Sequence, residues 1–139
     1  MTHKLDFSLI INDNENAARE AFDRGDYLQA FLLIHTLIES LLRLFLKETD
    51  TEIKFSTLIK KYNQFLDQQK YPVKTLVKEL TEFNRRRNRI VHQLWHKGYS
   101  YTNRQSKSAA NAALILYGLA IEFLKTFDPE IIKIGFQYT

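Results

Sequence analysis

An arginine and a histidine set five positions apart are the residues of this sequence that carry the most chemical information. Arg87 and His92 lie within residues 72–97, whose apolar residues recur at helical spacing. On a helical projection, Arg87 falls near the middle of the apolar stripe and His92 falls at its margin. A guanidinium does not lose its charge, so this position requires a carboxylate, several acceptors or a water-filled cleft. The stripe consists of Val73, Leu76, Val77, Leu80, Phe83, Ile90, Val91 and Leu94.

Three interpretations of Arg87 are open at this point. Arg87 is a buried ion-pair partner with a structural role, or it lies in a helix–helix dimer interface. In the third interpretation it lines a cleft and meets an anionic ligand, with His92 as its companion, because ionisable groups cluster at functional sites. The identity and spacing of the neighbouring residues favour this third interpretation.

The segment from Arg87 to His92 reads Arg-Asn-Arg-Ile-Val-His, and it resembles the Arg-x(4–6)-His motif of the HEPN domains in their form with Asn after Arg. The motif lies on the second-to-last long predicted helix, and the resemblance in helix order covers residues 14–127. It implies a metal-independent RNA endonuclease of toxin or defence type. In that family two protomers line one composite cleft, the ribose 2′-hydroxyl is the nucleophile, and a 2′,3′-cyclic phosphate is left.

The resemblance assigns roles to four residues. His92 is expected to take or give a proton near neutral pH, with one histidine of a homodimer as base and the other as acid. Arg87 is expected to donate to the phosphate, and Asn88 to orient the imidazole or the RNA. Glu39, on an earlier helix, is expected to orient Arg87 or His92. The alternative for Glu39 is a surface ion pair with Arg43, four residues further on.

Other residues on the same predicted helix are expected to contact RNA. Arg85 and Arg89 lie on the side of the helix near His92 and are expected to follow the phosphate backbone, with a solvated face as the alternative. Trp95 is a candidate for stacking on a base, although packing in the core or in a dimer interface is the simpler expectation. His96, one turn beyond His92, is the fourth candidate RNA contact.

No metal or other cofactor is expected. His92 and His96 have the spacing of metal ligands, but Gln93 stands where a zincin helix has Glu, and no third ligand is evident. The absence of cysteine excludes disulfides, thiolate nucleophiles and zinc sites made of cysteine. His35 is expected to be a satisfied histidine at the boundary of the apolar face of its helix.

The elements that position these residues are predicted to be helices alone. Only 4 Gly and 2 Pro occur in 139 residues, so long segments run without a breaker. We expect one domain, residues 1–139, that folds as an all-α, up-and-down bundle of about five helices. Asn12 or Asp13 is the expected first N-cap, Gly25 the first stop and Asp26 the second N-cap. The predicted helices are residues 14–24, 27–47, 55–67, 72–97 and 106–127, with a loop at 99–104.

Charge and hydropathy set the expected location of the chain. The net charge of +4 is compatible with nucleic acid but does not diagnose it. Residues 1–7 lack an apolar signal core, and the apolar stretch 30–46 is interrupted by polar residues, so no membrane span is expected. We therefore expect a cytoplasmic protein. The apolar tail, residues 131–138, either packs as an edge segment or helps a dimer to form.

Two alternatives to RNA cleavage are open. In the first alternative, the chain is a non-catalytic HEPN-like module that binds nucleotide, RNA or a partner protein. In the second, it is a structural helical dimer in which Arg87 only pairs with Glu39. An antitoxin is a further candidate partner under the toxin interpretation. HEPN toxins paired with minimal nucleotidyltransferase antitoxins often carry Tyr two residues after the histidine, where this chain has Leu94. That departure argues against this kind of antitoxin, but not against RNA cleavage.

Overall fold

The computed structural model describes residues 7–136 and contains helices but no strand within that range. The prediction of an all-α fold is confirmed. Five long helices lie close to the predicted positions, and two short helices were not predicted. The elements are α1 (Phe7–Asp23), α2 (Tyr27–Leu46), α3 (Phe55–Gln68), α4 (Thr75–Lys97), α5 (Tyr99–Gln105), α6 (Lys107–Phe127) and the 3₁₀ helix η1 (Pro129–Ile134).

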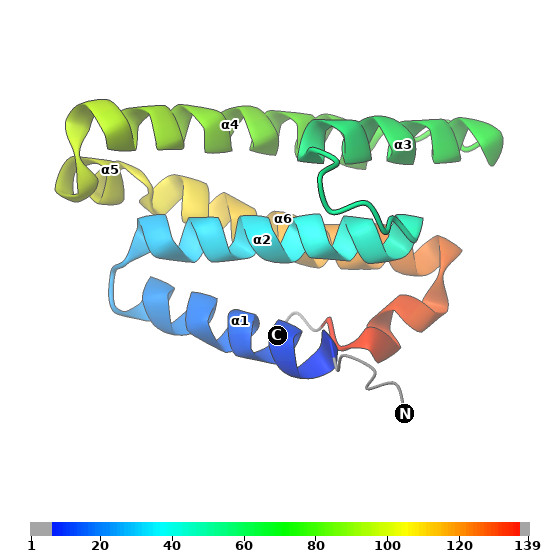
Figure 1. Ribbon diagram of the computed structural model, residues 1–139, viewed down its shortest axis with the longest axis horizontal. Coiled ribbons are helices and arrows are strands. Elements are labelled where there is room, and N and C mark those ends of the chain that lie inside the picture. Colours follow the sequence, from blue (N-terminus) through cyan, green and yellow to red (C-terminus); the bar gives the residue numbers. More distant parts are fainter. Residues whose placement is uncertain (1–6, 137–139) are drawn as a thin grey trace.

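Helix α2 is the centre of the bundle. In Figure 1 it lies between α1 on one side and the layer of α3 and α4 on the other, and α6 runs alongside it. Helix α2 can have several neighbours because its buried residues cover more than one face, unlike those of a surface helix with a single apolar stripe. These buried residues are Leu28, Ala30, Phe31, Ile34, His35, Leu37, Ile38, Leu41, Leu42 and Phe45.

The start of α1 was predicted wrongly. Helix α1 begins at Phe7, so Asn12 and Asp13, the predicted N-caps, are exposed residues within the helix. The reason is that Ile11 is buried in the core, and its burial extends the helix toward the N-terminus. Helix α4 likewise begins at Thr75 rather than at the predicted Pro72.

Residues 99–104, predicted as a loop, form most of helix α5. Gly98, with φ of 82°, separates α5 from α4. The side chain of Asn103 then reaches the N-terminus of α2, where its Oδ1 accepts the Leu28 N–H at 2.9 Å. Asp26 does occupy the N-cap position of α2, but its side chain makes no capping bond there and instead pairs with Arg24. Asn103, which is distant in sequence, therefore supplies the N-terminal cap of α2 that was predicted for Asp26.

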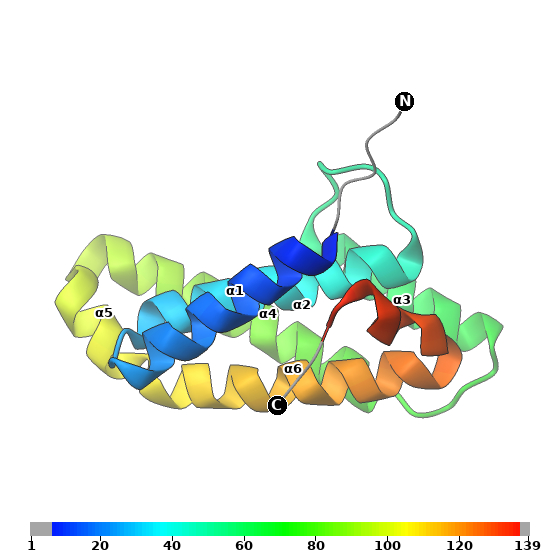
Figure 2. The same ribbon diagram turned by 90° about the horizontal axis from the view of Figure 1, so that it is seen from below.

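The end of the described chain packs on the bundle, as the edge-segment alternative predicted. Residues 129–134 form η1 against α6, and Ile131 is buried. Gly135 then lies so close to Ser8 of α1 that an added Cβ would stand 2.9 Å from two of its atoms. Figure 2 shows η1 beside the start of α1. Residues 137 and 138 of the predicted tail lie outside the described residues.

Two helices are long and apolar enough to cross a membrane when only length and composition are considered. They are α2 and α6, and 56% and 39% of their most apolar windows are buried within the bundle. Core helices of soluble proteins have the same composition.

A lysine in the left-handed region, where glycine is usual, is the C-cap of α2 and follows the C-cap of α3. Lys47 and Lys70 have φ of 56° and 55°. At both ends the next N–H donates to a carbonyl five residues back, which is the Schellman pattern, with N···O distances of 2.9 Å in each case. A side chain with a Cβ costs roughly 1 kcal/mol in this conformation.

We expect the Lys70→Gly variant to be more stable than the wild type by about 1 kcal/mol, because glycine adopts the left-handed conformation without steric cost. Urea unfolding followed by circular dichroism measures the change. The matched control is Lys70→Ala, which removes the charge but keeps the Cβ, and which should show no such gain. Equal stability of the Gly and Ala variants would contradict this explanation.

Candidate functional site

A polar pocket of about 280 Å³ lies between α2, the start of α3 and the middle of α4. Three separate stretches of sequence meet here, and two of its residues, Lys54 and Arg87, are cations. Both belong to elements that face α2 from the other layer of the bundle. The pocket is lined by His35, Glu39, Lys54, Phe55, Ser56, Asn84, Arg87 and Asn88.

Arg87 lies in this pocket without a carboxylate partner among residues 7–136. The guanidinium is partly buried, and its one hydrogen bond within residues 7–136 is donated by Nη1 to Oδ1 of Asn88 at 3.4 Å. Glu39 lines the same pocket but forms its ion pair with Arg43. The alternative in which Arg87 only pairs with Glu39 is therefore wrong. Most of the donors of Arg87 are left for a ligand.

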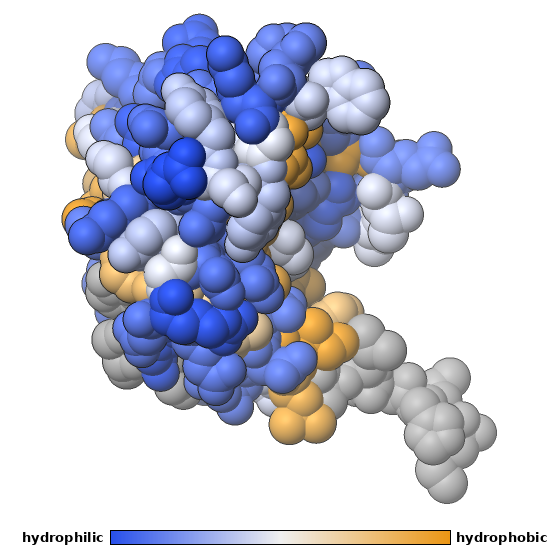
Figure 3. Space-filling view, turned by 90° about the vertical axis from the view of Figure 1, so that its left-hand side faces the viewer, coloured by the Kyte–Doolittle hydropathy of each residue, from blue (hydrophilic) through white to orange (hydrophobic). Residues whose placement is uncertain are grey.

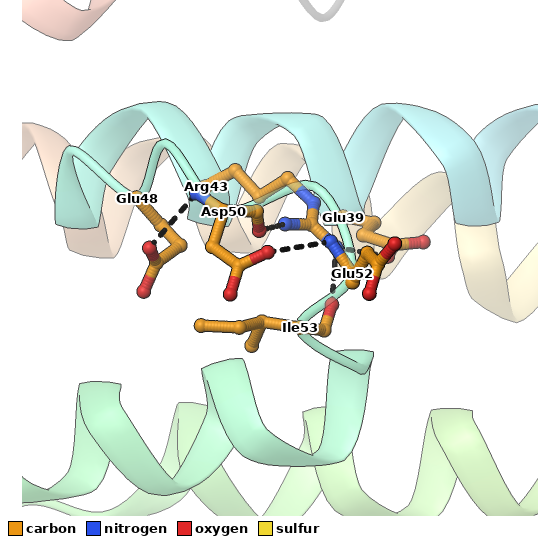
Figure 4. Close-up of polar contacts among 6 residues, drawn as sticks. All are labelled: Glu39, Arg43, Glu48, Asp50, Glu52 and Ile53. Atoms are coloured by element: carbon orange, nitrogen blue, oxygen red, sulfur yellow. Dashed lines mark hydrogen bonds and ion pairs between the residues drawn. The ribbon is translucent and has the colours of Figure 1, made fainter.

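Arg43 holds the connection between α2 and α3 in place (Figure 4). Its Nη2 donates to Glu39 at 3.2 Å and to the carbonyl of Ile53, and its Nη1 donates to the carbonyl of Asp50 at 2.9 Å. The predicted pair of Glu39 with Arg43 is thus confirmed, but it is not a surface pair, because the Arg43 side chain is only 19% exposed. The predicted contact of Glu39 with Arg87 or His92 is not found. Lys61 of α3 adds a second tie to this connection by pairing with Glu48.

His35 was not predicted as a site residue, and its position is the main finding that sequence reasoning missed. It is 7% exposed and lies between the rings of Phe55, at 4.9 Å, and Phe83, at 5.1 Å. Its Nε2 is buried, and no described residue offers it a hydrogen bond. The expectation of a satisfied boundary histidine is therefore wrong for Nε2. In the sequence, the position of His35 at the margin of the apolar face of α2 did not indicate that its ring would be buried with an unpaired nitrogen.

Burial and charge act together on the imidazole of His35. Burial lowers its pKa to about 4, the positive charge of Arg87 acts in the same direction, and a hydrogen-bonding interaction with the Asn84 side chain offsets part of the effect. His35 is therefore neutral at physiological pH. A neutral imidazole has one donor and one acceptor, so it accommodates polar ligands without adding charge.

His92 lies outside the pocket. It is exposed on α4, and its ring lies 4.3 Å from the ring of His96, centroid to centroid. Five helical residues turn through about 140° beyond one full turn, so Arg87 faces the bundle while His92 faces solvent. Asn88 is exposed and borders the pocket, but its hydrogen bond goes to Arg87, and the predicted bond to the imidazole is not found.

The predicted RNA-contacting residues lie on the exposed side of α4. Arg85 and Arg89 both pair with Glu82, at 3.3 and 3.6 Å, through side chains that are mostly exposed. Trp95 is 85% exposed, so it does not pack in the core of its own protomer. His96 is also exposed. These four residues share a solvent-facing ridge with His92, separate from the pocket that holds Arg87.

An apolar groove of about 440 Å³ lies near Trp95, between α2, the end of α4 and α5. The surface around this end of the molecule is mainly hydrophilic, with hydrophobic side chains in recesses and along the edges (Figure 3). Several large apolar side chains nearby are exposed, namely Val91, Trp95, Tyr99 and Tyr101. The groove itself is lined by Leu28, Gln29, Leu32, Leu33, Thr36, Leu94 and Tyr99.

Within residues 7–136, no group of three or more His, Asp or Glu side chains is placed to hold a metal ion. The pair of His92 and His96 has no third ligand beside it in this range. The polar groups of the described pocket are a guanidinium, an ammonium, a carboxylate, a hydroxyl, two amides and an imidazole.

We expect the Arg43→Lys variant to lose about 1–2 kcal/mol of stability, because one ammonium cannot reach Glu39 and both loop carbonyls together. Urea unfolding measures the loss, and limited proteolysis should show faster cleavage within residues 47–54. The control is Arg24→Lys, at an exposed pair with Asp26, where little change is expected. If both variants were equally stable, Arg43 would not anchor the connection.

We expect His35 to make stability depend on pH. Its pKa falls from 6.5 in the unfolded chain to about 4 in the folded state, so its contribution is fully present above pH 6.5 and is lost as the pH falls toward 4. This predicts a loss of about 2 kcal/mol between pH 8 and pH 5, measured by urea unfolding. His35→Gln should remove most of this dependence and His92→Gln should keep it. A dependence that survives in His35→Gln would assign it to other groups.

Comparison with known proteins adds no family to this description: no protein-family model, no curated protein and no solved structure matches the chain. The fold is established as all-helical by the structure alone. The likeness to HEPN domains rests on the residues from Arg87 to His92 and on the order of the helices, and it supports a proposal about function rather than membership of that family.

Proposed function

We propose that this protein is a HEPN-type RNA endonuclease that acts as a homodimer and needs no metal. The observation that carries the proposal is the guanidinium of Arg87, which is partly buried in a polar pocket without a carboxylate partner among the described residues. Such a charge is costly to keep unless it meets an anion. A phosphate of the RNA backbone is the anion that its planar set of donors fits.

The reaction proposed is an internal transfer at phosphorus. His92 takes the proton of the ribose 2′-hydroxyl, whose oxygen attacks the adjacent phosphorus. The bond to the 5′-oxygen of the next nucleotide breaks, and that oxygen receives a proton from His92 of the partner subunit. The products are a 2′,3′-cyclic phosphate and a free 5′-hydroxyl. Arg87 stabilises the charge that builds on the phosphate oxygens in the transition state.

The position of His92 supports the proposal of a second protomer. Arg87 and His92 of one chain face different directions, and His96 is the ring that contacts His92. A second copy that covers the exposed side of α4 would bring another imidazole close to His92. The exposed apolar residues beside the groove of α2, α4 and α5 support such a contact, because a twofold dimer buries the same patch on both copies.

A toxin or defence role fits such an activity, since uncontrolled cleavage of RNA must be restrained or triggered. A protein that covers the exposed side of α4, including His92 and Trp95, would act as an antitoxin by excluding RNA from it. A cytoplasmic location is part of the same proposal, because the substrate would be cellular RNA.

We expect His92→Ala to abolish RNA cleavage, with at least a hundredfold loss of rate, because it removes the proton carrier. Cleavage of a set of single-stranded and structured RNAs, with a chelator present, measures the activity. The matched control is Gln93→Ala, the next exposed residue of α4, which has no assigned role and should keep most of it. The cyclic phosphate ends are identified by mass spectrometry of the products.

Three outcomes would each contradict part of the proposal. Purified wild-type protein that never cleaves RNA above the level of the His92→Ala variant would contradict the activity. A monomeric mass by light scattering, at the concentration at which cleavage is seen, would contradict the dimer. Loss of activity on adding a chelator would contradict the metal-independent reaction.

The second candidate function is a non-catalytic module that binds nucleotide or RNA. The observation that favours it is the separation of His92 from the pocket, since binding at Arg87 does not require the exposed imidazole. This candidate predicts RNA affinity that survives His92→Ala in a protein that shows no cleavage. Fluorescence anisotropy of a labelled RNA separates the two candidates.

A further inference from the structure

We propose that the pocket between α2, α3 and α4 is a phosphate subsite that extends beyond Arg87 to Lys54, the first backbone amides of α3 and His35. None of these additional groups belongs to the motif from Arg87 to His92. The identification of the natural ligand as an RNA phosphate rests on the proposed function. The affinity of the pocket for phosphate is tested independently of that function.

The charges around the pocket favour an anion. Arg87 and Lys54 line it as cations. Glu39 lines it as an anion, but its charge is balanced by Arg43 at 3.2 Å. His35 is held neutral and adds no charge. The pocket therefore carries net positive charge, and no other described carboxylate lines it.

The start of α3 points backbone donors at the same space. Lys54 is the N-cap residue and Phe55 and Ser56 are the first helical residues, and all three line the pocket. No side chain caps this end of α3. The first amides of a helix have no partner within the helix and favour anions. Arg43 fixes the direction of this end, since it bonds the carbonyl of Ile53 just before it.

His35 is the independent observation that points to a ligand. Its Nε2 is buried and has no hydrogen-bond partner among residues 7–136, although the ring is held between Phe55 and Phe83. A buried polar atom without a partner is costly, and such atoms in native structures generally have a reason. A rotation of the ring that turns this nitrogen toward the pocket would let a phosphate oxygen become its partner.

Arg87 has donors that its own protomer does not use. A guanidinium has five N–H donors arranged along more than one edge, and within residues 7–136 one of them is used by Asn88. The remaining donors are left for an anion in the pocket.

The experiment uses the full chain carrying His92→Ala, which leaves the pocket intact and prevents cleavage. Inorganic phosphate, adenosine 5′-monophosphate and the dinucleotide ApA are titrated in turn, with adenosine alone as the control. Nitrogen and proton signals of the histidine rings are followed by NMR. We expect phosphate to shift the His35 signals and to raise the pKa of His35, because a bound anion stabilises its charged form.

Single variants test the contacts. Lys54→Gln is expected to weaken phosphate binding about tenfold, as is His35→Gln. Lys60→Gln is the matched control: Lys60 is an exposed lysine within α3 that does not line the pocket, so binding should be unchanged. Lys54 is exposed, so its substitution leaves the core intact.

The outcomes separate this inference from the proposed function. Phosphate binding that depends on Lys54 and His35 supports the subsite even if the wild-type protein cleaves no RNA. A response to the monophosphate alone assigns the subsite to a terminal phosphate, and a response to ApA as well assigns it to a backbone phosphate. Unshifted His35 signals, or equal affinity in Lys54→Gln and Lys60→Gln, would overturn the subsite even if RNA is cleaved.

Discussion

The site depends on the hydrogen bonds of Arg43. This one side chain joins a carboxylate of α2 to two backbone carbonyls of the connection between α2 and α3, those of Asp50 and Ile53. A connection of this length has many conformations, and the guanidinium selects one of them. Because that conformation sets where α3 begins, it also sets the wall of the pocket that faces α4. The geometry around Arg87 is therefore decided by a different arginine on a different helix.

Much of the fold is explained by periodicity in the sequence. The long helices were predicted because apolar residues repeat at helical spacing over stretches with few breakers. Helix α5 was missed because it has only 7 residues and no apolar stripe. It is held by tertiary contacts, such as those of Asn103 with Leu28 and with the carbonyl of Gly25. Short helices of this kind are decided by their surroundings rather than by their own residues.

The candidate site was predicted in part. The position of Arg87 within the apolar stripe correctly indicated a partly enclosed cation. The pattern of one helix is enough to show a charged residue at a position where an apolar residue is expected. His35 and Lys54 were not associated with it, because three segments distant in sequence must fold together before they become neighbours. The pairing of Glu39 was open for the same reason. Arg43 was close enough in sequence to be considered, but its reach to Ile53 depends on the path of the connection.

Trp95 gives the protein a spectroscopic property that results from its location. It is the single tryptophan of the chain, and its side chain is 85% exposed at the end of α4. Its fluorescence emission therefore comes from an indole already in water, so unfolding of the bundle changes that emission little. A macromolecule that covers this end of α4 moves the indole away from water, which shifts the emission to shorter wavelength and protects it from ionic quenchers. Buried tyrosines such as Tyr62 report on the core, and Trp95 reports on what touches the surface.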